Sequence, residues 1–253
     1  MIPTGSHPGC HPVFEALAYA VGYAVFRLQR TRRGDILAEP QRWTIIAAAA
    51  VGALAGSRLL GLAEQWPTVL AASRSGRLFT LLLASGGKTI VGGLLGGWLA
   101  VELAKRFAGI RSRTGDLFVL PLCAGIAVGR VGCFLAGLAD DTYGKPTTLP
   151  WAVNFGDGIG RHPTQLYEIL FLAVLAIILS RPWSRPEGAR FRIFLGAYLA
   201  WRLAIDFLKP QPLVAGLNLI QWACAAGLAV LGALYLNDRR AERRRMLEHV
   251  VLD

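Results

Sequence analysis

Apolar residues in this chain gather in long blocks that are separated by short polar connections. The blocks lie near Val13–Leu28, Trp43–Leu62, Thr89–Ala104, Asp116–Ala136, Gln165–Ser180, Phe191–Leu208 and Val214–Leu236. A helix that crosses a bilayer needs about 20 mainly apolar residues, because each residue rises about 1.5 Å. The pattern therefore predicts an all-α, polytopic transmembrane bundle of about seven spans, formed by a single domain over residues 1–253.

A further apolar stretch, Val69–Ala84, leaves the number of spans open. It contains Arg74 and Arg77, and charged side chains are costly inside the hydrocarbon core. We interpret this stretch as an interfacial or re-entrant segment, with an eighth span as the alternative. The first dozen residues contain no Lys or Arg, so we expect the first block to be a retained anchor and not a cleaved signal peptide.

Basic residues predict the orientation of the bundle. They follow the first, third, fifth and seventh blocks, as Arg30, Arg32 and Arg33; Lys105, Arg106, Arg111 and Arg113; Arg181, Arg185, Arg190 and Arg192; and Arg239, Arg240, Arg243, Arg244 and Arg245. With seven spans these four segments share one side, and the positive-inside rule makes that side cytoplasmic. We therefore expect the N-terminus outside and the C-terminus in the cytoplasm.

Composition supports a membrane protein and argues against two other classes. Only 17% of the residues are charged, whereas soluble domains average about 25%. The net charge of +11 does not indicate a nucleic-acid partner, because the basic residues lie between apolar blocks and not on one basic face. The four cysteines show no CxxC pair and no metal-binding spacing, so we predict neither a metal site nor structural disulfides.

Several ionisable residues lie inside the apolar blocks, and such residues are candidates for function. In the expected topology six of them fall in the outer half of the bilayer: Glu15, Arg58, Arg130, Glu168, Arg202 and Asp206. They either form ion pairs that hold the helices together or line a site, and their shared depth favours a site. Guanidinium groups stay charged and match phosphate with a planar set of donors, so we expect a phospholipid headgroup from the surrounding lipid bilayer as the ligand.

Two segments carry unusually ordered motifs for a membrane sequence. The first begins with GRVGCF at residues 129–134 and continues through YGKPT at 143–147 and LPWAV at 149–153. The second is RHPTQLYE at residues 161–168, at the start of the fifth block. Pro163 fits the first turn of a helix, where its missing N–H is no loss, and the free N–H groups of that turn favour an anion.

These motifs resemble those of the prolipoprotein diacylglyceryl transferase family, and Tyr198–Asp206 and Gln221 fit the same pattern. The resemblance implies a multi-pass transferase of the bacterial inner (plasma) membrane. It would move the diacylglyceryl group of phosphatidylglycerol to the lipobox cysteine thiol of a prolipoprotein signal peptide and release glycerol phosphate. The resemblance implies no cofactor, metal or nucleotide.

The resemblance also implies roles for individual residues. Arg130 corresponds to the arginine that holds the phosphate, and Arg202 to a second functional arginine, with Asp206 in place of the usual Glu. His162 matches the histidine of the family's HP-S/T-Q block, and Tyr19 matches a tyrosine of the first span. We assign catalysis to His162, Arg202, Glu168 and Asp206. We assign substrate binding to Arg130, Gly129, Gly132, Gln165, Tyr19 and Lys88.

Four departures from the family pattern keep other functions open. Val91 stands where the family has a histidine, Cys133 replaces the usual Asn, Glu15 replaces a tyrosine, and Asp140 and Asp141 lengthen the connection to the YG pair. Without the histidine, His162 and Glu168 are the candidate bases for the attacking thiol, since thiolate is the nucleophile. The alternatives are a diverged member that transfers a lipid moiety to another acceptor, and a non-catalytic phospholipid-binding membrane protein.

Overall fold

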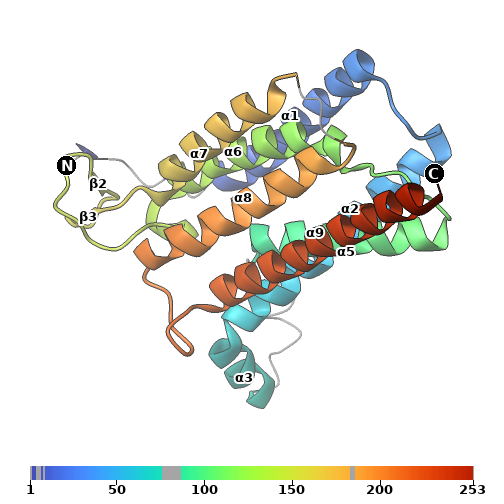
Figure 1. Cartoon of the computed structure of the whole chain (residues 1–253). Helices are drawn as coiled ribbons and strands as arrows, with labels where there is room; N and C mark the ends of the chain where they lie inside the picture. Colours follow the sequence, from blue (N-terminus) through green and yellow to red (C-terminus); the bar gives the residue numbers. More distant parts are fainter. Residues whose placement is uncertain (1, 4–6, 8, 76–86, 183–185, 253) are drawn as a thin grey trace. The chain divides into compact units, whose positions relative to one another are not determined.

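The computed structural model describes residues 2–3, 7, 9–75, 87–182 and 186–252, and it is mainly helical (Figure 1). A helix covers each of the seven predicted apolar blocks. The helices are α1 (Cys10–Arg33), α2 (Glu39–Glu64), α5 (Ile90–Phe107), α6 (Val119–Ala136), α7 (Thr164–Ser180), α8 (Ala189–Ile205) and α9 (Leu219–Leu252). Short 3-10 helices precede α6 at Gly115–Phe118, follow it at Gly137–Asp140, and follow α8 at Asp206–Leu208. The prediction of a helical protein is confirmed.

The predicted blocks differ most from the observed helices at α9, which continues to Leu252 and does not end at Leu236. This helix begins at Leu219 and not at Val214, because Val214 and Leu217 pair their backbones across a tight turn. Asn218 and Gln221 then exchange bonds: the Gln221 N–H donates to Asn218 Oδ1 at 2.7 Å, and the Asn218 N–H donates to Gln221 Oε1 at 2.9 Å. This reciprocal capping box satisfies N–H groups that the first helical turn leaves without backbone partners.

Three of the described helical segments are long and apolar enough to cross a membrane. They are Glu39–Glu64, Gly115–Asp140 and Leu219–Arg243, and α7 is a shorter apolar helix. The helix α3 (Trp66–Arg74) covers only the beginning of the Val69–Ala84 stretch, and residues 76–84 of that stretch lie outside the described part of the chain. At nine residues, or about 13 Å, α3 by itself is too short to cross the hydrocarbon core.

The chain divides into two compact units. The first comprises Met1–Ile45, Lys105–Phe194 and Ile205–Pro212, and the second comprises Ile46–Ala104, Leu195–Ala204 and Leu213–Asp253. In the first unit α6 packs against both α1 and α7. The helices α2 and α8 each contribute residues to both units.

Glycines let α2 and α5 pack backbone against backbone in the second unit. A Cβ at Gly56 would lie 2.3 Å from the carbonyl oxygen of Gly92, and one at Gly52 would lie 2.5 Å from that of Gly96. Real side chains do not tolerate such distances, so both contacts require glycine. Small residues at helix contacts are typical of membrane proteins, where association depends on close packing.

A small sheet accompanies the helices and was not predicted from the sequence. It has three two-residue strands in the order β1 (Ile2–Pro3), β2 (Val153–Asn154) and β3 (Gly160–Arg161). The strand β2 pairs parallel with β1 and antiparallel with β3. Two residues are too few for an alternating pattern to be visible in the sequence.

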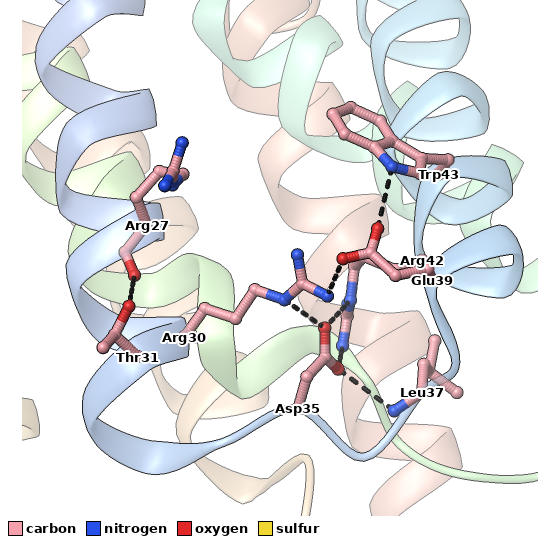
Figure 2. Close-up of polar contacts among 8 residues, drawn as sticks. All are labelled: Arg27, Arg30, Thr31, Asp35, Leu37, Glu39, Arg42 and Trp43. Atoms are coloured by element: carbon pink, nitrogen blue, oxygen red, sulfur yellow. Dashed lines mark hydrogen bonds and ion pairs between the residues drawn. The ribbon is translucent and has the colours of Figure 1, made fainter.

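An ion-pair cluster joins the end of α1 to the start of α2, as Figure 2 shows. Asp35 accepts hydrogen bonds from Arg42 Nε at 2.7 Å, from Arg42 NH2 and from the Leu37 N–H, and it lies 3.2 Å from Arg30 Nε. Glu39 accepts from Arg30 NH2 at 2.7 Å. We call Arg30, Asp35, Glu39 and Arg42 the Asp35 cluster; its two positive and two negative charges balance.

Candidate functional site

Arg130 and Glu168 form a buried ion pair between two helices of the first unit. Arg130 lies on α6 and Glu168 on α7, with 3.0 Å between Arg130 Nε and Glu168 Oε2. Their exposed fractions are 6% and 2%. The pair links α6 to α7 and keeps a guanidinium charge among apolar helices. Removing either partner of such a pair leaves an uncompensated buried charge, which costs about 3–5 kcal/mol.

The glycines beside Arg130 differ in what their surroundings demand. A Cβ at Gly132 would lie 2.5 Å from the Cβ of Phe14 on α1, so α1 approaches α6 only because this residue is glycine. A Cβ at Gly129 would make an ordinary 3.8 Å contact with the Cβ of Ala18. Gly132 therefore has a packing role, and contact of either glycine with substrate stays a prediction.

Backbone hydrogen bonds hold the YGKPT stretch against the RHPTQLYE block. The Gly144 N–H donates to the His162 carbonyl at 3.0 Å, and the His162 N–H donates to the Lys145 carbonyl at 3.1 Å. A Cβ at Gly144 would lie 2.6 Å from the Cβ of His162. The two motifs, 14 or more residues apart in the sequence, are thus two sides of one structure at the start of α7.

The His162 imidazole is half-buried beside aromatic side chains. Its Nδ1 lies 3.3 Å from the Tyr167 hydroxyl, and the two rings meet edge to face at 6.1 Å. Trp151 Nε1 donates to the same hydroxyl at 2.7 Å. With Nδ1 held by Tyr167, the ring is oriented so that its other nitrogen can exchange a proton.

Gln165 connects the start of α7 to the end of the α6 region. This side chain is 1% exposed, and its Nε2 donates to the Thr142 hydroxyl at 3.2 Å. Thr142 in turn donates to Asp140 Oδ2 at 2.6 Å. Gln165 therefore orients Asp140 through Thr142, and its predicted contact with substrate is not needed to explain its burial.

The remaining predicted site residues occupy different surroundings. Arg202 lies on α8 in the second unit and is 4% exposed. Asp206 lies in the 3-10 turn after α8, where its Oδ1 is 3.6 Å from Lys209 Nζ. Tyr19 is 73% exposed on α1, and Lys88 is exposed before the start of α5. The structure thus brings together Arg130 and Glu168 in the first unit, and it places Tyr19 and Lys88 on the surface of their own elements.

The sequence interpretation missed three residues that converge beside Arg130: His11, Cys133 and Asp140. Their nitrogen, sulfur and oxygen atoms all lie within 4.8 Å of one another. His11 Nε2 is 3.0 Å from Asp140 Oδ1, and Arg130 NH1 is 3.8 Å from Cys133 Sγ. No spacing rule connects them, because His11 is more than 120 positions from the other two. The only available signal was that Cys133 and Asp140 are both departures from the family pattern.

The loop between β2 and β3 is exposed and internally hydrogen-bonded. Asn154 Oδ1 accepts from the N–H groups of Gly156 and Gly158 at 2.9 and 3.0 Å. Asp157 pairs with Arg161 at 2.6 Å, and this bond lowers the pKa of the Asp157 carboxyl. The loop is therefore ordered by its own side chains, next to the segment that holds His162.

Comparison with known proteins identifies the relatives of this chain. A family model described as prolipoprotein diacylglyceryl transferase matches residues 11–237. The chain belongs to the prolipoprotein diacylglyceryl transferase family. It is therefore a transferase by family, with a helical membrane architecture.

Individual relatives carry the name phosphatidylglycerol–prolipoprotein diacylglyceryl transferase. The Geobacter sulfurreducens protein is 30% identical over 214 residues, which covers 79% of this chain and 77% of the relative. The Methylococcus capsulatus protein is 31% identical over 218 residues, which covers 81% of this chain and 80% of the relative. The Bordetella parapertussis protein is 34% identical over 176 residues, which covers 64% of this chain and 65% of the relative.

Within the family pattern Val91 remains the most consequential departure. Its side chain is 1% exposed on α5, at the position that the motif resemblance gives to a histidine of the family. Valine cannot accept a proton.

Proposed function

We propose that this protein transfers the diacylglyceryl group of phosphatidylglycerol to the lipobox cysteine thiol of prolipoproteins in the bacterial inner membrane. The names of the relatives, over about four fifths of the chain in two cases, support this substrate pair. The single structural observation that carries the proposal is the buried guanidinium of Arg130 beside the motif-bearing start of α7.

We propose seven membrane spans with the N-terminus outside, in one integral-membrane domain over residues 1–253. The seven helices that match the apolar blocks support the number of spans. Arg30 of the Asp35 cluster lies near the C-terminal end of α1 and Arg42 near the start of α2, whereas His11 lies at the N-terminal end of α1. The 19 residues from His11 to Arg30 span about 29 Å along the helix, close to the thickness of the hydrocarbon core. This spacing fits cytoplasmic arginines and an outer site near Arg130.

In this proposal Arg130 holds the phosphate of phosphatidylglycerol, and Arg202 is the second functional arginine that the family resemblance implies. Guanidinium donors match two phosphate oxygens, and they stabilise the charge that develops on the leaving group. Glu168 holds Arg130 in place until the phosphate arrives. Since a carboxylate engaged by a guanidinium is a poor proton acceptor, His162 is the better candidate for the base.

The proposed reaction is a displacement at carbon. His162 takes the proton of the acceptor thiol, and the thiolate sulfur forms a bond to the glyceryl carbon. The bond between that carbon and the phosphate oxygen breaks, and glycerol phosphate leaves with the electron pair. Asp206 is the remaining proposed catalytic residue. The other residues proposed to bind substrate are Gly129, Gly132, Gln165, Tyr19 and Lys88.

The test combines complementation with transfer by the purified protein. Expression in a bacterium depleted of its own transferase should restore lipid-modified prolipoprotein. The purified protein should move labelled diacylglycerol from phosphatidylglycerol to a lipobox peptide, and not to the same peptide with Ser in place of Cys. Failure of both assays with a folded, membrane-inserted protein would overturn the proposal.

The buried Val91 favours one second candidate: transfer of a lipid moiety to a different acceptor. The distinguishing result is release of glycerol phosphate from phosphatidylglycerol without modification of the lipobox peptide. Val91→His then serves as the companion variant, because a gain of peptide modification would show that the rest of the site is intact.

A further inference from the structure

We propose that His11, Cys133 and Asp140 form a binding site for a divalent transition metal of the zinc class. The three side chains offer one nitrogen, one sulfur and one oxygen ligand, all within 4.8 Å of one another. They come from the start of α1, from α6 and from the 3-10 helix that follows α6, all in the first unit. This proposal departs from our expectation of no metal, which rested on spacing along the sequence.

The ligand set fits the coordination chemistry of zinc. Zinc binds imidazole nitrogen and carboxylate oxygen at about 2.0–2.2 Å and thiolate sulfur at about 2.3 Å, usually in a tetrahedron. Ligand atoms on one such ion lie about 3.5 Å apart by this geometry. The His11–Asp140 distance of 3.0 Å is already close to that value. Three protein ligands leave a fourth position open, as in catalytic zinc sites.

Neighbouring side chains support two of the ligands from behind. Asp140 contacts His11 through Oδ1, and its Oδ2 accepts a hydrogen bond from the Thr142 hydroxyl at 2.6 Å. Gln165 orients that hydroxyl by donating to it from Nε2. Arg130 NH1 approaches Cys133 Sγ at 3.8 Å. Such second contacts orient metal ligands and are a regular part of metal sites.

Packing brings the third ligand to this place. Gly132, one residue before Cys133, gives room to Phe14 of α1. The N–H of His7 donates to the Leu135 carbonyl at 2.9 Å and ties the segment before α1 to the end of α6. His11 is therefore held against α6 by contacts that precede and follow it in the chain.

The charges of the proposed site balance when a divalent ion is bound. A thiolate at Cys133 and a carboxylate at Asp140 neutralise the two positive charges of the metal, and His11 binds as the neutral ring. The adjacent Arg130 is compensated by Glu168 at 3.0 Å. A neutral site suits a partly buried position better than separate charges do.

A metal here gives the proposed transfer a way to activate the acceptor, and this part of the inference rests on the proposed function. The open position would take the lipobox sulfur, which loses its proton on coordination because metal-bound thiols are deprotonated. The proton passes to His162 or to water. The sulfur then forms its bond to the glyceryl carbon as glycerol phosphate leaves with the electron pair. Coordination makes the thiol more acidic, so that it loses its proton in a site where Val91 cannot act as a base.

The test titrates cobalt(II), a spectroscopic substitute for zinc, into the purified, metal-free full-length protein in detergent. We expect about one ion per chain and an absorption band of sulfur-to-cobalt charge transfer. Cys133→Ser should abolish the band, and Asp140→Asn should weaken binding at least tenfold. Cys10→Ser is the matched control, because it removes the thiol next to His11 and should leave the band unchanged. Size-exclusion chromatography verifies that each variant is folded.

A folded wild-type protein that shows no charge-transfer band would overturn the metal site, as would a band that survives Cys133→Ser. In either case the His11–Asp140 contact is a simple ion pair. Because cobalt binding is measured without substrate, it is independent of transfer. Cobalt binding without any lipid transfer would retain the metal site and reject the proposed function, and transfer that is unaffected by removal of bound metal would reject only the role in activation.

Discussion

The Asp35 cluster and the group around Arg130 both place arginines in polar contacts inside a helical protein, but they are built differently. The Asp35 cluster draws its members from residues 30–42, across one short connection. The group around Arg130 brings together the start of α1, the end of α6 and the start of α7. The first is complete within a local segment, whereas the second exists only after three helices have packed.

This difference indicates different uses of buried charge. In the Asp35 cluster the Asp35 carboxylate binds Arg42 through two hydrogen bonds and accepts a third from the Leu37 N–H (Figure 2). The Arg42 guanidinium also lies over the ring of Phe118, 5.6 Å from its centroid. The group around Arg130 instead adds a thiol, an imidazole and a carboxylate, which are side-chain groups typical of metal binding and catalysis. We infer that the first cluster stabilises the connection between α1 and α2, and that the second serves function.

The largest expected effect concerns the Asp35 cluster. Asp35→Ala leaves Arg42, which is 1% exposed, without its bidentate partner. We expect the free energy of unfolding in detergent to fall by about 3 kcal/mol. The lipid transfer of the fraction that remains folded should be unchanged. Asp157→Ala, which removes an exposed ion pair, is the control and should have little effect on stability. Loss of transfer in well-folded Asp35→Ala would contradict the purely structural assignment.

The next largest effect concerns Arg130, and we expect it in the rate of lipid transfer. Arg130→Lys keeps the positive charge but loses the two-pronged geometry, so transfer should fall at least about tenfold, or about 1.4 kcal/mol. The protein should remain folded and inserted, as judged by thermal shift. The matched variant is Arg42→Lys, where we expect reduced stability with normal transfer. If Arg130→Lys transfers at the wild-type rate, Arg130 only joins the two helices.

A smaller effect tests the packing that holds His162. Gly144→Ala introduces a Cβ that would lie 2.6 Å from the Cβ of His162 and 2.7 Å from its carbonyl oxygen. Since neither neighbour is the end of a flexible side chain, we expect stability to fall by about 1 kcal/mol. Gly9→Ala is the control, because a Cβ there meets nothing within 4 Å. Equal melting temperatures for the two variants would show that the loop is looser than described.

The smallest expected effect is the pH dependence that Asp35 contributes. Burial acts to raise the pKa of this carboxyl, but the hydrogen bonds from Arg42 and Leu37 outweigh it and the pKa is lowered. A lowered pKa in the folded state stabilises the protein at pH values above the ordinary value of 3.8. That contribution is lost as the pH falls below 3.8 through the folded value. Thermal melts in this acidic range should show a steeper loss for the wild type than for Asp35→Asn, and parallel curves would contradict the assignment.

Much of the fold follows from the sequence, because each apolar block is long and helix formation there depends on local composition. The small sheet escaped prediction, since its strands have two residues each. The start of α9 was misplaced because Ala215 and Gly216 adopt positive φ angles that end regular structure before Leu219.

The candidate site was likewise predicted only in part from the sequence. Motif resemblance picked out Arg130, His162 and Glu168, and the structure then paired Arg130 with Glu168. Arg202 and Asp206 were both expected in the sixth apolar block, and in the structure Arg202 lies on α8 while Asp206 lies in the 3-10 turn that follows it, near Lys209.

The sequence by itself determined the helical membrane character, the positions of the helices and the family, because hydropathy and motifs are properties of contiguous residues. Only the tertiary structure decided which charged groups meet. His11 reaches Cys133 and Asp140 because Gly132 admits α1 against α6, and that contact joins residues more than 120 positions apart. Such pairings depend on how helices pack, which no local pattern in the sequence encodes.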